Sequence, residues 1–181
     1  MLKITVPAAE FWDEIHEEFV YKKEQTLQLE HSLVSLSKWE SKWNKAFLGK
    51  QEKTDEEILD YIRCMTLTQN VDPEVYTRLS NDNYAKINAY IEAPMTATYF
   101  SNEKQVRGSK ETVTSELIYY WMISYNIPVD ICQKWHLNRL LTLIRVCNLK
   151  NSPPKKRSRR EIMDHHKALN AANRKRFGSK G

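Results

Sequence analysis

The adjacent prolines Pro153 and Pro154 mark the point where the charge of this chain changes sign. A helix does not continue through such a pair, because proline lacks the N–H donor and restricts the residue before it. Residues 150–181 hold eleven Lys and Arg but only two acids, so they carry +9 while the whole chain carries +5. The remaining residues therefore carry −4. The sequence predicts a body, residues 1–150, and a basic arm, residues 151–181.

The body is long enough to bury its own core. Of the 181 residues, 41% are hydrophobic and 4 are Gly, which excludes collagen-like and largely disordered chains. Cys64, Cys132 and Cys147 are odd in number, lack CxxC spacing and lie in apolar surroundings, which predicts reduced, buried thiols in a cytosolic compartment. No apolar run approaches the length of a membrane span, and the N-terminus lacks the pattern of a signal peptide.

The first half of the body predicts short strands followed by helices. Strands are expected near 2–6, 19–21 and 25–31, and acids interrupt the apolar residues between 11 and 20. Ser37 with Glu40 resembles a capping box and predicts a helix over about 37–48 that ends at Gly49. Further predictions are a capped helix from Thr54 to Met65, a turn at Asp72-Pro73, a helix over Tyr84–Ile91 and an extended piece over 95–100.

The second half predicts the most apolar helices. After a mobile loop at 101–110, helices are expected over 114–126 and 134–149. Ser158 with Glu161 predicts a last helix from Arg159 to about Arg176, which has too few apolar residues for a buried face and should project. The expected fold is α+β, mainly α: a helical domain with a small N-terminal β element and a projecting basic C-terminal helix.

No group of residues predicts catalysis. His165 and His166 are adjacent, so on a helix they point about 100° apart and do not share a metal ion. His136 lies near Cys132 and Cys147 in sequence, but apolar neighbours favour burial of the thiols over a nucleophile. The chain lacks a Gly-rich phosphate loop, a GxSxG elbow and an HExxH motif. We expect no enzyme activity, no cofactor and no metal.

The basic arm has two interpretations. Its Lys and Arg side chains suit nucleic-acid phosphates, or an acidic patch on a protein partner or on a second copy in a homo-oligomer. The candidate arm contacts are Lys155, Lys156, Arg157, Arg159, Arg160, Arg174, Lys175 and Arg176.

Aromatic residues are candidates for a protein interface. Trp39 and Trp43 are four residues apart on one helical face, and Trp121 and Trp135 lie in the apolar second half. Core packing is the usual role of such residues, but Trp and Tyr are also enriched at binding hot spots. The four tryptophans are the candidate partner-binding residues.

The segments TLQLEHSLVSLSKWESKW, IEAPMTATYF, ELIYYWMISYNIP and KWHLNRLLTLIRVCNLKNSPPKK together resemble a group of proteins of tailed phages and prophages of Gram-positive bacteria. The resemblance covers nearly the whole chain and implies a role in virion morphogenesis. Size and helical content are most similar to a tail assembly chaperone, which implies binding to the tape-measure and tail-tube proteins. The tryptophans would then hold apolar helices of the client, a helix-in-groove mode.

Two other functions stay open from the sequence. The charge of residues 152–181 is compatible with a nucleic-acid-binding component of the packaging machinery or connector. A phage-encoded inhibitor of a host defence is the third hypothesis.

Overall fold

A computed structural model of the chain describes residues 1–14, 16–100, 111–152 and 159–178. It divides into two compact units, Met1–Cys147 and Asn148–Gly181, which are described separately. The first unit, the body, contains strands and helices, and the second contains the end of one helix and a further basic helix.

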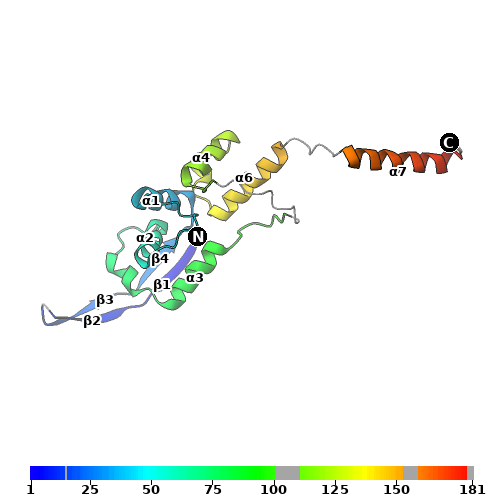
Figure 1. The fold of residues 1–181 in the computed structure, drawn as a ribbon. Coiled ribbons are helices and arrows are strands. Elements are labelled where there is room, and N and C mark those ends of the chain that lie inside the picture. Colours follow the sequence, from blue (N-terminus) through cyan, green and yellow to red (C-terminus); the bar gives the residue numbers. More distant parts are fainter. Residues whose placement is uncertain (15, 101–110, 153–158, 179–181) are drawn as a thin grey trace. The chain divides into compact units, whose positions relative to one another are not determined.

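The β structure forms two antiparallel pairs (Figure 1). Strand β1 (Leu2–Val6) pairs with β4 (Gln25–Leu29), with Leu2 opposite Leu29. Ile4, Val6, Leu27 and Leu29 alternate along the two strands and are buried, as expected for a sheet with one face on the core. Strand β2 (Ala9–Asp13) pairs with β3 (Glu18–Lys22) as a hairpin.

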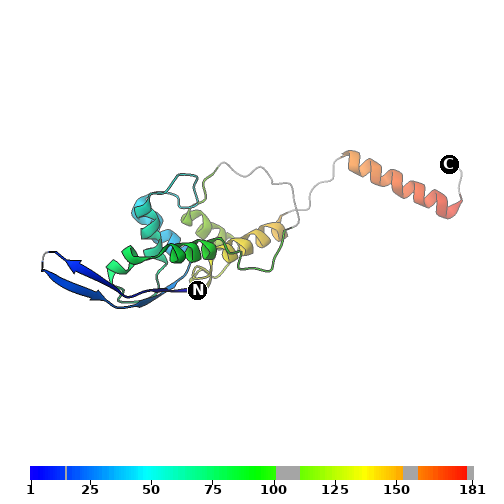
Figure 2. The same ribbon diagram turned by 90° about the horizontal axis from the view of Figure 1, so that it is seen from below.

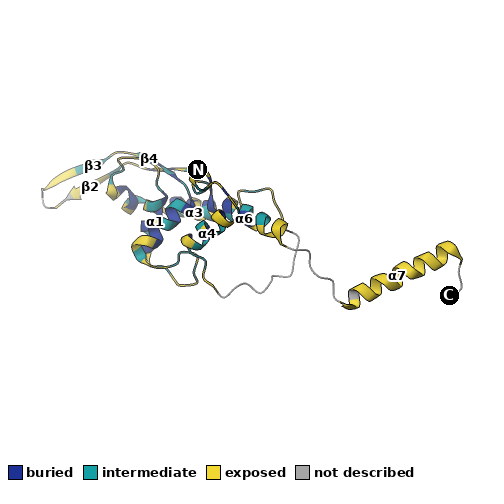
Figure 3. Ribbon diagram, turned by 90° about the horizontal axis from the view of Figure 1, so that it is seen from above, coloured by how far each residue is buried: buried dark blue, intermediate teal, exposed yellow. Residues whose placement is uncertain are grey.

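The hairpin differs from the sequence prediction. We expected only a strand at 19–21, because acids interrupt the apolar residues of 11–20. The described side chains of β2 and β3 are exposed or half-buried (Figure 3). A strand of this kind does not need one continuous apolar face, so the alternation that identifies half-buried strands is absent.

The helices follow in chain order. Their bounds are α1 (Leu33–Trp43), α2 (Asp55–Met65), the 3-10 helix η1 (Pro73–Arg78), α3 (Asn81–Glu92), α4 (Ser115–Ser124), α5 (Val129–Cys132), α6 (Leu137–Asn151) and α7 (Arg159–Phe177). The predicted mixed fold, mainly helical with a small N-terminal β element, is confirmed. The loop 101–110 and the capping residue Ser158 lie outside the described residues.

Helix α2 begins as predicted, whereas α1 does not. Thr54 and Glu57 form the expected capping box at α2. Helix α1 instead begins after Ser32, whose side chain accepts from the Ser35 N–H, and it ends at Trp43 rather than at Gly49. Asn44 adopts the left-handed conformation with φ of 51°, and its N–H donates to the Glu40 carbonyl.

Smaller differences affect the chain around α3 and α6. Residues 95–100 contain no strand, and the helix expected from 134 begins at Leu137. The short helix α5 precedes it.

The buried apolar residues form two clusters. The first joins β1, β4, α2, η1 and α3, and it contains Leu29, Ile62, Ile87 and the α1 residue Trp39. The second joins α4, α5 and α6 with the beginning of α1, and it contains Leu36, Ile118, Met122 and Leu140. Helix α1 thus contributes to both clusters, and Phe47, which follows it, packs against both.

Candidate functional site

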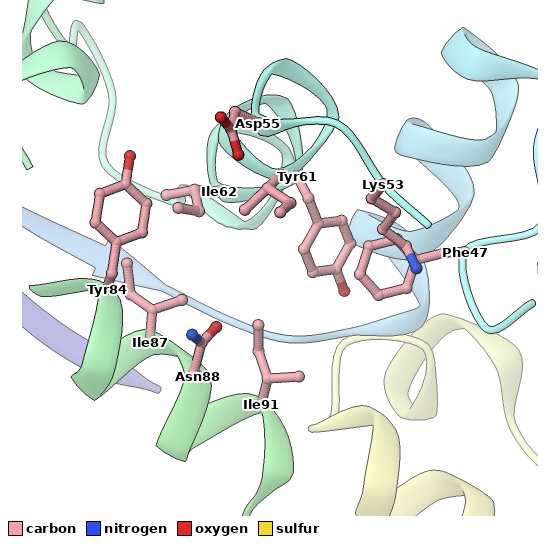
Figure 4. A pocket seen from close by; sticks show the side chains of 10 residues that line it. Phe47, Lys53, Asp55, Tyr61, Ile62, Tyr84, Ile87, Asn88 and Ile91 are labelled. Carbon is pink, nitrogen blue, oxygen red and sulfur yellow. The ribbon is translucent and has the colours of Figure 1, made fainter. Parts of the chain in front are cut away.

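A groove between α2 and α3 is lined mostly by apolar side chains (Figure 4). It has a volume of about 620 Å³, within the range of pockets that hold small ligands or a few side chains. Ile58 and Ile62 of α2 line it together with Ile87 and Ile91 of α3. Ile62 lies across the groove from Ile87, with Tyr84 at one end. Each isoleucine pair is four residues apart, so both members point to the same side of their helix.

Two charged side chains also line the groove. Lys53 and Asp55 flank Thr54, the capping residue at the start of α2. The Lys53 ammonium lies 4.7 Å from the centre of the Phe47 ring, a cation–π contact. The groove therefore combines apolar side chains with two charged ones, an arrangement that suits an amphipathic polypeptide segment.

The carboxylate of Glu57 fixes the start of α2. It forms an ion pair with Lys45 and accepts from the Thr54 N–H, and the hydrogen bond from Lys45 holds the pKa of this carboxyl below its usual value. The Glu57 backbone carbonyl accepts from the indole N–H of Trp39 at 2.8 Å. The wall of the groove is thereby tied to α1.

A buried pair of histidines lies behind the groove. Tyr61, whose ring stacks on Phe47 with centroids 3.8 Å apart, is hydrogen-bonded to His31 Nδ1 at 2.6 Å. The His31 and His136 rings are 5.2 Å apart, and His136 Nε2–H donates to the Tyr90 carbonyl at 2.9 Å. Burial, and to a lesser degree the charge of His136, lowers the pKa of His31 to about 4.

His136 is held in its neutral form. Burial lowers its pKa, and the Asn138 N–H donates to its Nδ1 at 3.3 Å. Ser32 pairs with His136 in an isolated β-bridge, and the Leu137 N–H donates to the His31 carbonyl at 2.7 Å. The two histidines thus join the loop before α1 to the start of α6.

The four tryptophans do not form one surface. Trp39 is 1% exposed and belongs to the core, so it has no surface to offer to a partner. Trp43 is half-buried, and its indole N–H donates to the Asp60 carboxylate at 2.9 Å. Both pack in the first cluster, whereas Trp121 and Trp135 pack against the second.

Trp121 and Trp135 are partly accessible. Trp121 lines a shallow hollow of about 1080 Å³ with Leu48, Val113 and Leu141. The Arg139 guanidinium lies 4.2 Å from the centre of the Trp135 ring. These two tryptophans, with Trp43, remain candidates for partner contacts.

The predicted burial of the cysteines holds for only one of them. Cys132 is buried, while Cys64 and Cys147 are half-buried, and all three are free thiols. Among the described residues, no group of three or more His, Cys, Asp or Glu is arranged to hold a metal ion. Nor does any helix in that part of the chain have the length and apolar character to cross a membrane.

The β2–β3 hairpin exposes aromatic side chains. Trp12 and Phe19 face each other across the strands with ring centroids 4.9 Å apart, and they are 51% and 66% exposed. Tyr21 shares their face and is also exposed, whereas Phe11 lies on the opposite face. At the base, Lys22 forms ion pairs with Asp72 and Glu74.

Helix α7 carries the described part of the candidate arm contacts. Arg159, Arg160, Arg174, Lys175 and Arg176 belong to it and are exposed. Lys155, Lys156 and Arg157 lie outside the described residues. Four exposed apolar side chains, Ile162, Met163, Leu169 and Phe177, lie among the basic ones.

The groove and the hairpin were not predicted as sites. The isoleucine pairs of α2 and α3 have the i, i+4 spacing of an apolar helical stripe, and this spacing alone does not separate a core stripe from the lining of a groove. The aromatic residues of β2 were missed because the strand itself was missed.

Comparisons of the chain with protein-family models, with curated proteins and with solved structures find no match.

Proposed function

We propose that this protein is a phage morphogenesis factor, in particular a tail assembly chaperone, that holds an apolar helix of its client in the groove between α2 and α3. The observation that carries the proposal is the groove itself: Ile58, which is 40% exposed, and the half-buried Ile91 offer apolar surface above a floor formed by the core residues Ile62 and Ile87. The sequence resemblance supplies the expected clients, the tape-measure and tail-tube proteins.

A client helix would place its apolar residues between Ile58 of α2 and Ile91 of α3, the two isoleucines of the groove that keep accessible surface. Residues at i, i+3, i+4 and i+7 of an amphipathic helix form one apolar stripe, which matches a groove bounded by two helices. Lys53 and Asp55, which also line the groove, would fix the direction of the client through its charged side chains. The basic arm adds attraction toward acidic partners. Binding of this kind needs no catalytic group, in line with the expectation that the protein is not an enzyme.

The test is co-expression with the tape-measure and tail-tube proteins of the same phage, followed by affinity capture. Ile58 is 40% exposed, so Ile58→Glu introduces a charge into the groove without removing a core residue. We expect this variant to retain about a tenth or less of the client, because one isoleucine contact is worth about 1.5–3 kcal/mol when fully buried.

Ile123→Glu is the matched control. Ile123 is 66% exposed on α4, a helix that does not line the groove. The control should capture as much client as the unmodified protein. Recovery of neither client, or equal capture by both variants, would contradict the proposal.

A second candidate function is supported by α7. Arg174, Lys175 and Arg176 are consecutive and exposed at its end, and phosphate contacts need only such accessible cations. We propose as the alternative that the arm binds the phosphate backbone of nucleic acid during packaging or at the connector.

Gel-shift titrations in rising salt test this alternative. Each phosphate contact lowers the slope of log K against log salt concentration by about 0.9. Replacing Arg174, Lys175 and Arg176 with Gln removes up to three phosphate contacts. The slope should therefore become shallower by up to about three times 0.9. Affinity that does not change with salt would contradict this function.

A further inference from the structure

The outer edge of strand β3 is open to a further strand. The hairpin is a sheet of two strands, so β3 pairs with β2 on one side and carries outward-facing N–H and C=O groups on the other. No backbone–backbone hydrogen bond between the described residues reaches these groups. Within the body, the hairpin extends away from the helices in two perpendicular views (Figures 1 and 2). A sheet of only two strands is marginally stable in water, so further strands would stabilise it.

The sequence of β3 is complementary to itself in the antiparallel direction. When Val20 lies opposite Val20 of a second copy, Phe19 lies opposite Tyr21 of that copy. In the same register, Glu18 lies opposite Lys22. Aromatic pairs and pairs of opposite charge stabilise neighbouring antiparallel strands. A parallel alignment in register would instead place acid beside acid and base beside base.

The complementarity continues beyond the strand. Glu17 precedes β3 and Lys23 follows it, both are exposed, and the same register brings each of them to the other residue of the second copy. Lys22 already forms ion pairs with Asp72 and Glu74 of its own chain and keeps 25% of its side chain exposed. Lys23 is therefore the more available base for a neighbouring copy.

The aromatic face of the hairpin would extend across both copies. Trp12, Phe19 and Tyr21 share one face and are 51%, 66% and 64% exposed. Contact between Phe19 and Tyr21 of the two copies joins the two aromatic faces and covers part of this exposed surface. Because a strand pairs with itself only in another molecule, this complementarity identifies the partner as a second copy of the chain.

We propose that the outer edge of β3 pairs antiparallel with β3 of a second copy, which joins the two hairpins into a four-stranded sheet around a two-fold axis at Val20. The same residues of both copies meet in such an interface, so association stops at a dimer. The strand does not line the α2–α3 groove, so client binding and dimerisation are separate properties.

Val20 provides the sharpest test, because a residue on the two-fold axis lies opposite its own copy. Val20→Lys and Val20→Glu each place like charges on directly opposite residues, whose Cβ atoms are about 5 Å apart. Sedimentation velocity of the full chain over a range of concentrations measures the dimer. Each variant alone should dimerise at least about tenfold more weakly than the unmodified protein, because the valine contact is lost and like charges repel. An equimolar mixture should dimerise again, since an ammonium group then lies opposite a carboxylate.

Phe11→Lys is the matched control. Phe11 lies opposite Val20 on β2 and is 47% exposed, so this variant adds the same charge to the same face of the hairpin. In the proposed sheet the two added ammonium groups are three strand spacings apart, about 14 Å, which exceeds the screening length of about 8 Å at physiological ionic strength. The control should dimerise like the unmodified protein. Circular dichroism checks that each variant is folded.

Glu17 and Lys23 provide a second test that changes only exposed side chains. Glu17→Lys alone and Lys23→Glu alone should each weaken the dimer about fivefold, because two exposed ion pairs become repulsive. The double variant exchanges the two charges and keeps the net charge of the chain. Both ion pairs form again with reversed sign, so it should dimerise like the unmodified protein.

Three results would overturn the proposal. The first is an unmodified protein that sediments as a monomer at every concentration. The second is a mixture of the folded Val20→Lys and Val20→Glu variants that remains monomeric. The third is a double variant of Glu17 and Lys23 that dimerises no better than the two single variants, and this result decides the matter if the Val20 variants do not fold.

Discussion

Acidification should destabilise the body through its buried histidines. The pKa of His31 is about 4 in the folded chain and about 6.5 in an unfolded chain, so unfolding takes up a proton between these values. The folded state binds fewer protons, and its free energy of unfolding therefore falls as the pH falls. The stabilisation is complete above the unfolded pKa and is lost progressively toward pH 4.

The expected magnitude follows from the two pKa values. Between about pH 7.5 and pH 5, proton uptake by His31 alone lowers the free energy of unfolding by about 2 kcal/mol. The pKa of His136 is also lowered, so its contribution has the same sign. Carboxylates such as Glu57, whose pKa is held low by Lys45, lose their stabilisation only at more acidic pH. The pH range above 5 therefore isolates the histidines.

Urea denaturation followed by tryptophan fluorescence at several pH values measures this dependence. His31→Gln retains a hydrogen-bonding partner for Tyr61 but does not titrate, so its free energy of unfolding should change by at least about 1 kcal/mol less over the same range. His166→Gln on the exposed helix α7 is the control and should keep the full dependence. An unchanged dependence in His31→Gln, or a protein that becomes more stable on acidification, would refute the reasoning.

Four further changes have defined outcomes. Trp39→Ala should lower the free energy of unfolding by about 3–5 kcal/mol in urea denaturation, because the ring is buried and its N–H is hydrogen-bonded; a loss below 1 kcal/mol would place Trp39 outside the core. Glu40→Ala should cost about 2–4 kcal/mol by the same measurement, since the carboxylate accepts from the buried N–H groups of Phe47 and Ser115 at 2.8 and 2.7 Å; Glu40→Gln should recover part of this loss. Thr54→Ala should cost about 1 kcal/mol through the capping box, and Thr54→Ser should cost much less. Deletion of 152–181 should leave the midpoint of thermal unfolding of the body unchanged by calorimetry, and a lower midpoint would show that the arm stabilises the body.

Local signals in the sequence predicted most of the helices. The Thr54–Glu57 spacing located the start of α2 because a capping box depends only on residues three apart. Ser37 and Glu40 have the same spacing but lie inside α1, because burial of Leu33 and Leu36 extends the helix toward its N-terminus. The two spacings are equally good capping signals, and tertiary packing determines which of them begins a helix.

The candidate site was less predictable than the fold. Whether Ile58 lines a groove or fills a core depends on the distance between α2 and α3. The sequence of α2 alone does not determine that distance. His31 and His136 are far apart in sequence and lie in contact because β4 and α5 end at the same place in the body. Such a pair becomes visible only when the chain is folded.

The division of the core has a consequence for how the body opens. The two clusters of buried side chains meet along α1 and Phe47, and also where α6 begins: Ser32 forms a β-bridge with His136, and His136 contacts Tyr90 of the first cluster. Separate clusters behave as separate cooperative units, so α4–α6 can detach while the β1–β4 sheet and α2 stay closed. Amide protons of α4–α6 would then exchange with deuterium faster than those of the β1–β4 sheet and α2. The contacts of His136 between the two regions would determine the difference between the two exchange rates.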